Sequence, residues 1–349
     1  MRKLITPFLA GVAILSLVGC GSSDDDGSSG SQNGSVTLRL GYFPNITHSQ
    51  PIVGLARGTF AQELGPNVKL DMSKTFNAGP SAMEALLAGA IDATYVGPGP
   101  ATNAFIKSDG ALRIVAGATS GGALLIVRPD AGISAPKDFS GKKIASPQLG
   151  NTQDVALRSW LLANDLGANE SGGDVVVEPT QNPDTLNLFK QGDIDGAWVP
   201  EPWATRLIQE AGGKVFLDER SLWPNGDFVT THLVVRTDFL QEHADVVERL
   251  VRANVAVTKW INDNPVDAKK LVNDGIKQVT GASLSQSVID AAWGNMTITY
   301  DPLPDSLRKG ADDAFKLGFL KDEPDLTKIY ALDSLNNVLV GEGLPPVKG

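Results

Sequence analysis

Alternation of apolar and polar residues along the chain predicts a repeated order of strand and helix. Residues 36–41 alternate as a half-buried strand does, and residues 51–64 carry apolar side chains at helical spacing on one face. The same order continues through predicted strands and helices at 68–72, 81–88, 91–96, 100–107, 112–118 and 123–127. Strands that alternate with helices at this spacing indicate parallel βαβ units and an α/β fold.

The pattern then restarts and ends in long helices. A second series of strands and helices is predicted at 142–146, 152–164, 174–178, 184–191, 196–199, 203–211, 214–217 and 231–236. Long helical patterns follow at 244–264, 266–280 and 306–317, and the chain closes with a helical segment at 326–340. The body after residue 35 has roughly 310 residues, which suggests two domains.

The first residues predict a secretory signal that ends in a lipidation site. Arg2 and Lys3 precede an apolar run over 4–18, which is shorter than the roughly 20 residues that span a bilayer. The run ends in Leu-Val-Gly-Cys20, which resembles the bacterial lipobox, in which the cysteine receives a diacylglycerol. The alternative is an ordinary signal peptide with an incidental cysteine. Residues 21–35 contain only Gly, Ser, Asp, Gln and Asn, which predicts a flexible tether.

Composition narrows the classes of function. Cys20 is the only cysteine, so we expect no disulfide, thiolate metal site or catalytic cysteine in the body. A net charge of -10 does not favour nucleic acid, whose binding depends on Lys and Arg. The three histidines, His48, His232 and His243, lack the spacing of metal ligands, so neither a metal nor a cofactor is predicted.

Seven loops follow predicted strands, at the edge where open α/β sheets bind ligands. They contain glycines, hydroxyl and amide side chains, but no Lys or Arg. Helix starts present unpaired N–H groups at the positive end of the helix dipole, so such loops suit an oxyanion without a formal positive charge. Each motif also has a structural explanation, as a helix cap, a turn or a core side chain. The loops are 42–49, 77–81, 97–100, 119–122, 150–153, 198–203 and 227–231.

Ordered motifs along the body then point to a known family. Gly41-Tyr-Phe-Pro-Asn is followed by GPSAMEALLAGAID at 79–92 and by Gly97-Pro-Gly-Pro. Later, DFSGKKIA at 138–145 precedes GDIDGAW at 192–198 and Pro-Glu-Pro at 200–202. This series resembles the nitrate/sulfonate/taurine binding proteins of ATP-driven (ABC) importers, over residues 36 to 345.

The resemblance implies two α/β lobes with a ligand cleft between them, a type II periplasmic-binding-protein-like fold with a helical C-terminal section. Lobe one would be discontinuous (36–129 plus 228–349) and lobe two would be 130–227, after a signal peptide (1–19) and the lipidated tether (20–35). The protein would be a monomer, lipid-anchored at the outer face of the cytoplasmic membrane or in the periplasm. Its partners would be a small organic anion, an ABC permease and the ATPase of that permease.

By motif position, the resemblance also implies the ligand contacts. Backbone N–H groups near 79–81 and 151–153 would hold the acid group. Glu201 in the cleft would favour a zwitterion such as taurine, and Glu201 facing solvent would favour a plain sulfonate. The implied contacts are Phe43, Asn45, His48, Gly79, Pro80, Ser81, Gly97, Gly99, Ser120, Asn151, Thr152, Gln153, Trp198, Glu201 and Thr230.

Other functions stay open at this point. The same fold hosts enzymes, among them a thiamine-pyrimidine synthase with a cysteine-rich run and porphobilinogen deaminase with a cofactor-bearing cysteine. Both features are missing from the body, and no Ser-His-Asp spacing or Walker loop is present, so we expect no enzyme. A sensor lipoprotein without an importer is the second alternative. A binding protein for a neutral or pyrimidine-like molecule is the third.

Overall fold

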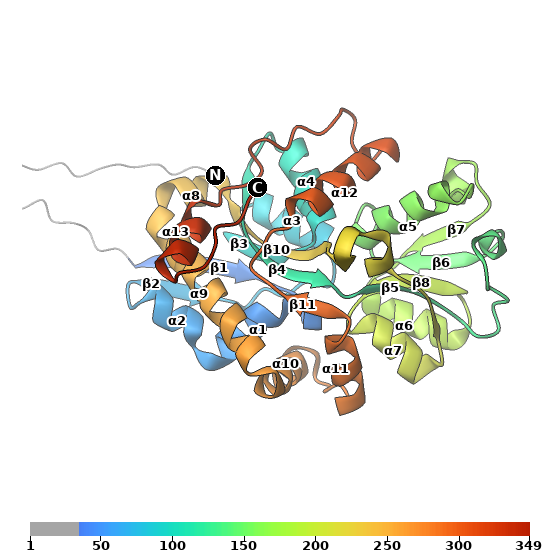
Figure 1. Cartoon of the computed structure of the whole chain (residues 1–349), viewed down its shortest axis with the longest axis horizontal. Helices are drawn as coiled ribbons and strands as arrows, with labels where there is room; N and C mark the ends of the chain where they lie inside the picture. Colours follow the sequence, from blue (N-terminus) through green and yellow to red (C-terminus); the bar gives the residue numbers. More distant parts are fainter. Residues whose placement is uncertain (1–34) are drawn as a thin grey trace, which may run out of the picture. The chain divides into compact units, whose positions relative to one another are not determined.

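The computed structural model describes residues 35–349 (Figure 1). The predicted signal peptide, Cys20 and the tether up to residue 34 lie outside the described residues. Within 35–349, none of the helices combines the length and the apolar character that crossing a membrane requires.

The first sheet has six strands in the order β11-β4-β10-β3-β1-β2. Strands β2, β1 and β3 run parallel, whereas β10 is antiparallel to both β3 and β4, and β11 is antiparallel to β4. The bounds are β1 (Val36–Gly41), β2 (Val68–Asp71), β3 (Ala93–Val96), β4 (Leu112–Gly121), β10 (Val229–Arg236) and β11 (Met296–Ile298).

The second sheet has five strands in the order β7-β6-β8-β5-β9. Strand β6 is parallel to β7 and β8, and β5 is antiparallel to β8 and β9. The bounds are β5 (Ala123–Val127), β6 (Lys143–Ser146), β7 (Val176–Pro179), β8 (Gly196–Pro200) and β9 (Lys214–Asp218). We call the first sheet with its covering helices lobe one, and the second sheet with its helices lobe two.

The helices cover both faces of each sheet (Figure 1). Lobe two carries α5 (Thr152–Ala163), α6 (Asn182–Gln191) and α7 (Trp203–Ala211). The other helices are α1 (Ser49–Arg57), α2 (Thr59–Leu64), α3 (Gly79–Leu87), α4 (Pro98–Lys107), α8 (Thr237–Glu242), α9 (Ala244–Asp263), α10 (Pro265–Thr280), α11 (Gln286–Trp293), α12 (Pro304–Lys316) and α13 (Asp333–Gly341). Helix α12 packs against α4 of lobe one and against α5 of lobe two.

Strand β5 shows why the sheet centres are apolar on both faces. Leu125 and Val127 pack in the core that contains α5, whereas Leu124 and Ile126 pack in the core that contains α6 and α7. Because successive side chains of a strand point to opposite faces, a strand covered by helices on both sides reads as a continuous apolar run.

The structure corrects parts of the predicted organisation. Both sheets are mixed, because β5, β10 and β11 run antiparallel to their neighbours. The sheet assignment also differs from the predicted lobe boundary at 129/130, since β5 belongs to the second sheet. The chain changes sheet at Gly121 and Gly122, which both have positive φ (74° and 75°), a conformation that favours glycine.

Several predicted helices have different limits. The helix predicted at 51–64 is two helices, separated by Gly58 in the left-handed conformation (φ 71°). Of the segment predicted at 326–340, only α13 is helical, and Tyr330 instead forms a β-bridge with Ile114 of β4. The short elements β11, α8 and α11 were not predicted, because their few residues carry little periodic signal.

Candidate ligand-binding site

A small cavity lies where loops of the two lobes meet. Its volume is about 30 Å³, which is room for one or two water molecules. Lobe one contributes the loop after β1, Asn77 in the segment that leads into α3, the end of β3 and the start of β10. Lobe two contributes the starts of α5 and α6 and the end of β8. The lining residues are Phe43, Asn45, Thr47, His48, Asn77, Gly97, Asn151, Thr152, Gln153, Asn182, Pro200, Thr230 and Thr231.

The lining is polar but carries no formal charge. It contains no Lys, Arg, Asp or Glu; its polar groups are amides, hydroxyls and one imidazole. A site of this kind recognises its ligand by hydrogen bonds and helix ends, because these can stabilise an anion without a cationic side chain.

The imidazole of His48 is held neutral in this lining. Its ring stacks on Phe43 at a centroid distance of 4.4 Å, and its Nδ1 lies 3.2 Å from the Thr47 hydroxyl. Burial lowers the pKa of His48 to about 3, and the nearby carbonyl of Tyr95 offsets only part of this effect. His48 therefore offers a neutral ring nitrogen to the cavity above pH 4 or so.

Three buried polar atoms of the lining have no hydrogen-bond partner in the described part of the chain. They are Nε2 of His48, Oδ1 of Asn182 and Oγ1 of Thr231. All three residues are at most 3% exposed. Because a buried polar atom without a partner is unfavourable, three of them around one cavity indicate a place for a polar ligand or for water.

The first turn of α5 is fixed by its own side chains. Asn151 caps the helix by accepting a hydrogen bond from the Thr152 N–H (2.8 Å). Asp154, which is fully buried, accepts from the Gly150 N–H (2.8 Å) and from the Ser146 hydroxyl (2.6 Å). The next N–H groups of this turn have no intrahelical acceptor, and Gln153 lines the cavity beside them.

The start of α4 lies against the start of α5. The Gly99 N–H donates to the Thr152 hydroxyl over 3.3 Å, and a Cβ added at Gly97 would lie 2.5 Å from the same oxygen. Pro98 and Pro100 have no N–H, so this helix start offers few donors for an anion. Its glycines instead let the two lobes approach closely.

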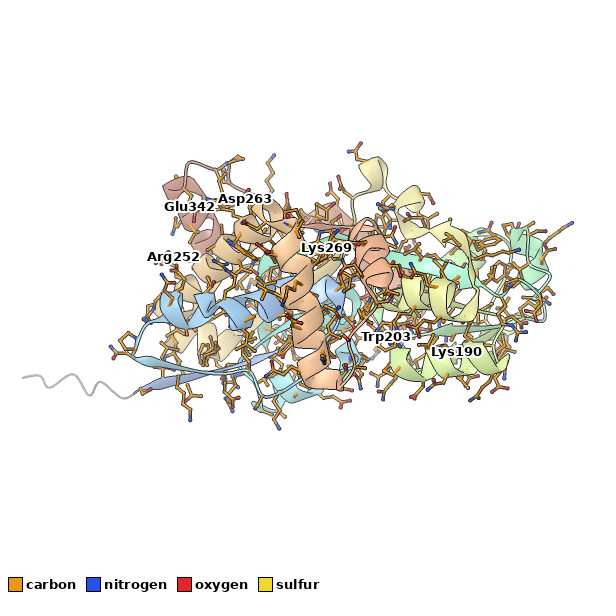
Figure 2. The ribbon with its side chains drawn as sticks, turned by 90° about the horizontal axis from the view of Figure 1, so that it is seen from below. Lys190, Trp203, Arg252, Asp263, Lys269 and Glu342 are labelled. Atoms are coloured by element: carbon orange, nitrogen blue, oxygen red, sulfur yellow. The ribbon has the colours of Figure 1, made fainter. Side chains whose placement is uncertain are left out.

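Eight predicted ligand residues line the cavity. One of them, Asn45, forms a hydrogen bond between the lobes, because its Oδ1 accepts from Nε1 of Trp203 (labelled in Figure 2) over 3.0 Å. The Thr230 hydroxyl already donates its hydrogen bond to the Gly121 carbonyl. The eight are Phe43, Asn45, His48, Gly97, Asn151, Thr152, Gln153 and Thr230.

Seven predicted residues lie outside the cavity lining. Gly79, Pro80 and Ser81 begin α3, where a Cβ on Gly79 would lie 2.3 Å from Pro100. Gly99 faces a neighbouring cavity, and Ser120 is buried in β4 between β10 and β11.

Trp198 and Glu201 have structural roles instead. Trp198 is fully buried in the core of lobe two, where its Nε1 donates to Glu219. Glu201 is fully buried at the start of α7, where its carboxylate accepts from the Thr205 N–H, the Thr205 hydroxyl and Nδ2 of Asn295. Burial raises the pKa of Glu201, and these hydrogen bonds oppose that rise.

The cavity also contains residues that were not predicted individually. Thr47, Asn77, Pro200 and Thr231 belong to loops that the sequence had indicated, but Asn182 does not. Asn182 begins α6 after β7, so the same rule of strand end and helix start would have found it.

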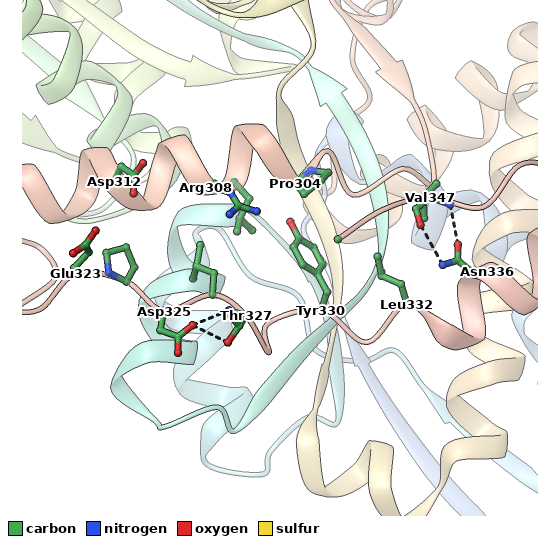
Figure 3. Close-up of a pocket in the computed structure, with 14 residues that line it drawn as sticks. Pro304, Arg308, Asp312, Glu323, Asp325, Thr327, Tyr330, Leu332, Asn336 and Val347 are labelled. Carbon is green, nitrogen blue, oxygen red and sulfur yellow. Dashed lines mark hydrogen bonds between the residues drawn. The ribbon is translucent and has the colours of Figure 1, made fainter.

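A larger cavity of about 750 Å³ lies elsewhere, between α12 and the C-terminal segment. Asp312 and Glu323 lie toward one end, and Asn336 bonds Val347 at the other (Figure 3). None of the predicted ligand residues lines it. The predicted ligand residues therefore gather at the cavity between the lobes and not at the larger one.

Comparison with known proteins places this geometry in a family. The sequence profile of the NMT1-like family matches residues 31–273. The chain is 30% identical to the taurine-binding periplasmic protein of Escherichia coli K12 over 63% of this chain and 65% of that protein, which is just under two thirds of its length. It is 24% identical to a putative aliphatic sulfonates-binding protein of Bacillus subtilis 168, over 99% of this chain and 97% of that protein.

Solved structures show the same fold. The alkanesulfonate-binding protein SsuA of Xanthomonas axonopodis pv. citri, bound to MOPS, superimposes with a TM-score of 0.71 at 17% identity. The match covers 85% of this chain and 98% of SsuA. The predicted fold class and the predicted family are confirmed by these matches.

Proposed function

The chain belongs to the NMT1-like family, and from this membership and the uncharged cavity we propose that it is the substrate-binding protein of an ABC importer. It captures a small organic anion, such as an aliphatic sulfonate or taurine, and delivers it to the permease. Its place is outside the cytoplasmic membrane, where a lipid on Cys20 anchors it.

The lining of the cavity is the observation that carries the proposal. Unpartnered atoms of His48, Asn182 and Thr231 surround a space with no charged side chain. Of these atoms, Nε2 of His48 and Oγ1 of Thr231 can donate hydrogen bonds to an oxyanion, whereas Oδ1 of Asn182 can only accept one, from water or from an N–H or O–H group of the ligand. The relatives are described as binding taurine and aliphatic sulfonates, and both kinds of molecule carry a sulfonate group.

Binding at this site requires movement of the lobes. The present volume of about 30 Å³ is too small for an organic anion together with its substituent. The ligand therefore enters when the lobes separate, binds the first turn of α5, and is enclosed when the lobe-one loops return. The same movement gives a permease two distinguishable states, with and without cargo.

A thermal-shift screen tests the proposal on residues 35–349. The test ligands are alkanesulfonates, nitrate, bicarbonate and phosphonates as anions, taurine as a zwitterion, and thiamine precursors as uncharged or cationic molecules. A ligand at 100 times its dissociation constant stabilises the fold by about 2.7 kcal/mol, which is several degrees of Tm.

Variants separate this site from others. Thr152→Ala with Gln153→Ala should abolish the shift, whereas Gln286→Ala, an exposed residue of α11, should leave it unchanged. A shift with a neutral heterocycle, and with no anion, would contradict the anion site but not solute binding.

A further inference from the structure

An arm of lobe one reaches lobe two beside the candidate ligand site. We call residues 304–329, which are α12 and the segment after it, the arm. Both of its ends are fixed in one core of lobe one, because Leu307 and Ile329 are buried there with residues of β4 and β10. Its middle packs on α5 instead, where Leu320 and Val155 belong to one apolar cluster. The middle of the arm is therefore a part of lobe one that rests on lobe two, as the place of α12 beside α5 shows (Figure 1).

The end of α12 fixes the position of Phe319. Gly318 has a positive φ of 77°, and its N–H donates to the Phe315 carbonyl over 2.9 Å. The Phe319 N–H donates to the Ala314 carbonyl over 2.9 Å. These two bonds form the Schellman motif, in which a left-handed glycine ends the helix and the next residue folds back on the last turn. The backbone of the arm, and not lobe two, therefore holds Phe319.

Phe319 lies beside two residues that hold the ligand turn (150–153) in place. A Cβ added at Gly150 would lie 3.7 Å from Cδ1 of Phe319, which is an ordinary contact distance. The Arg158 guanidinium lies over the Phe319 ring, with its Cζ 5.8 Å from the centroid. Arg158 in turn pairs with Asp154, which accepts from the Gly150 N–H. Phe319 thus covers both ends of the series of bonds that fixes this turn.

The environment of Arg158 depends on that ring. The side chain is 6% exposed, and within residues 35–349 its Nη2 has no hydrogen-bond partner. Its Nε bonds Asp154 and its Nη1 bonds Glu170. An aromatic face attracts a guanidinium and keeps water away from it, and a pair shielded from water is electrostatically stronger. The pair of Arg158 and Asp154 should therefore be strongest when Phe319 is in place.

We propose that Phe319 is a positioning residue for ligand binding. Carried by lobe one, it steadies the ligand turn of lobe two while the lobes are together and releases this turn when they separate. The inference rests on the proposed function, because it needs the turn to hold the ligand. Phe319 is absent from the lining of the ligand cavity, so it acts through Gly150, Arg158 and Asp154. Retention of the ligand then depends on a contact between the lobes that the ligand itself does not make.

Double electron–electron resonance tests the contact between the lobes without a ligand. Residues 35–349 contain no cysteine, so Glu84→Cys on α3 and Asn187→Cys on α6 place one spin label on an exposed site of each lobe. Phe319→Ala should shift the distances, with a change of about fivefold in the ratio of open to closed molecules. Phe315→Ala, which removes a ring that is 37% exposed on the last turn of α12, is the matched control and should cause no shift.

Surface plasmon resonance with taurine and ethanesulfonate tests the effect on binding. Phe319→Ala should raise the dissociation rate of both ligands about tenfold, whereas Phe315→Ala should leave it unchanged. Phe319→Tyr keeps the aromatic face and should restore the wild-type rate. Phe319→Leu keeps an apolar contact without the ring, so it should restore the rate only in part. A residue that only stabilised the fold would lower Tm and would not change the dissociation rate in this order.

A double variant tests the route through Asp154. Asp154→Asn and Phe319→Ala should each weaken binding about tenfold, and together clearly less than a hundredfold, because both loosen the same turn. Losses that multiply would overturn the action through Arg158 and Asp154.

Two further results would overturn the inference and leave sulfonate binding standing. One is a ratio of open to closed molecules that Phe319→Ala leaves unchanged, and the other is an unchanged dissociation rate in this variant. Failure of both sulfonates and of every other anion to bind would instead overturn the proposed function, and with it the ligand turn that Phe319 is inferred to position.

Discussion

Asp154 connects the ligand loop to the interior of lobe two. Its carboxylate holds the Gly150 N–H and the Ser146 hydroxyl, and Nε of Arg158 lies 3.1 Å from both of its oxygens. Burial raises the pKa of Asp154, and the hydrogen bonds and Arg158 oppose that rise. This buried pair therefore positions the turn that carries Asn151, Thr152 and Gln153.

Replacement of Asp154 by Asn separates positioning from charge. The amide keeps the shape of the carboxylate, but its NH₂ group faces one of the hydrogen-bond donors, so the turn at the start of α5 becomes less ordered. Anion affinity should therefore fall about tenfold, and the free energy of unfolding should decrease by about 1–3 kcal/mol. Calorimetry and urea denaturation measure the two effects. Ser146→Ala removes a single hydrogen bond and should have a smaller effect on affinity. A rise in affinity would show that repulsion between Asp154 and the anion outweighs positioning.

Glu219 predicts an unusual dependence of stability on pH. Its pKa is about 7 in the folded protein against 4.5 for the unfolded chain, so the folded state keeps a proton that the unfolded state releases. Below pH 4.5 both states are protonated and there is no penalty. The penalty grows as pH rises from 4.5 to 7 and then stays constant, at up to about 3 kcal/mol.

Glu219→Gln should remove this penalty. Ligand-free variant and wild type should be similar in stability near pH 4.5, and the variant should be more stable at pH 8. Urea denaturation at the two pH values measures the difference. Because only the difference between the two proteins is used, the opposite contributions of the buried His48 and His232 cancel. A difference that does not change with pH would contradict the burial of Glu219 as an acid.

At the scale of single residues, the sequence predicted part of the candidate site. The rule of strand end and helix start brought out Asn151, Thr152 and Gln153, because the local motif itself places them. Trp198 and Glu201 could not be separated from ligand residues, since a core side chain and a helix cap have the same composition as a site. Glu219, which lines the neighbouring cavity, had no signal in the sequence, because its burial depends on packing between distant segments.

The contact between the starts of α4 and α5 is the main feature at the scale of elements. The N-termini of α4 and α5 meet there, because the Gly99 N–H of α4 donates to the Thr152 hydroxyl of α5. Both helix starts lie at the candidate ligand site. Gly97 has an ordinary φ of -69°, so its importance comes from the missing side chain and not from its backbone conformation.

Gly97→Ala should hold these two helix starts apart. Its Cβ would lie 2.5 Å from the Thr152 hydroxyl, which requires a shift of α4 or α5. We expect weaker ligand binding, by about tenfold, with little change in Tm without ligand, because the strain arises only when the lobes are together. Gly341→Ala, where a Cβ meets nothing within 4 Å, is the control. A loss of Tm without a loss of affinity would mean that the contact is equally important in the open state.

The sequence predicted most strands and helices correctly, but it did not predict which strands pair in each sheet. Strand β5 was found from its apolar run, but its sheet was not, because a strand buried on both faces has the same pattern in either lobe. Likewise, β10 was found, but its insertion between β3 and β4 makes the sheet mixed, and pairing over more than a hundred residues leaves no local signal. The break at Gly58 depends on one φ angle, which periodicity does not report.

At the scale of the whole described unit, the two lobes contact each other through an apolar cluster of α4, α5 and α12 and through a few hydrogen bonds. Besides Gly99 and Thr152, Trp203 of lobe two donates to Asn45 of lobe one, and Glu201 accepts from Asn295 of lobe one. The Gln209 side chain also bonds Ser287 on α11. Since single hydrogen bonds are worth about 0.5–1.5 kcal/mol each, such contacts let the lobes separate and still favour closure.

The bond between Trp203 and Asn45 should therefore control how long a ligand stays. Asn45 is 5% exposed, so Trp203→Phe leaves its carbonyl oxygen buried without a partner in the closed protein only. The dissociation rate should rise about tenfold while the association rate changes little, because ligand enters before the bond forms. Surface plasmon resonance measures both rates without using tryptophan fluorescence.

Trp260→Phe is the control for this measurement, because Trp260 lies on α9 of lobe one, where Arg57 covers its ring at 3.8 Å. This variant should leave both rates unchanged. If Trp203→Phe slowed association and left dissociation unchanged, the bond would belong to the open protein and would organise the loop before the ligand arrives. A rise in dissociation specific to Trp203→Phe would instead show that the bond between Trp203 and Asn45 helps to keep the lobes closed on the ligand, in addition to the other contacts between the lobes.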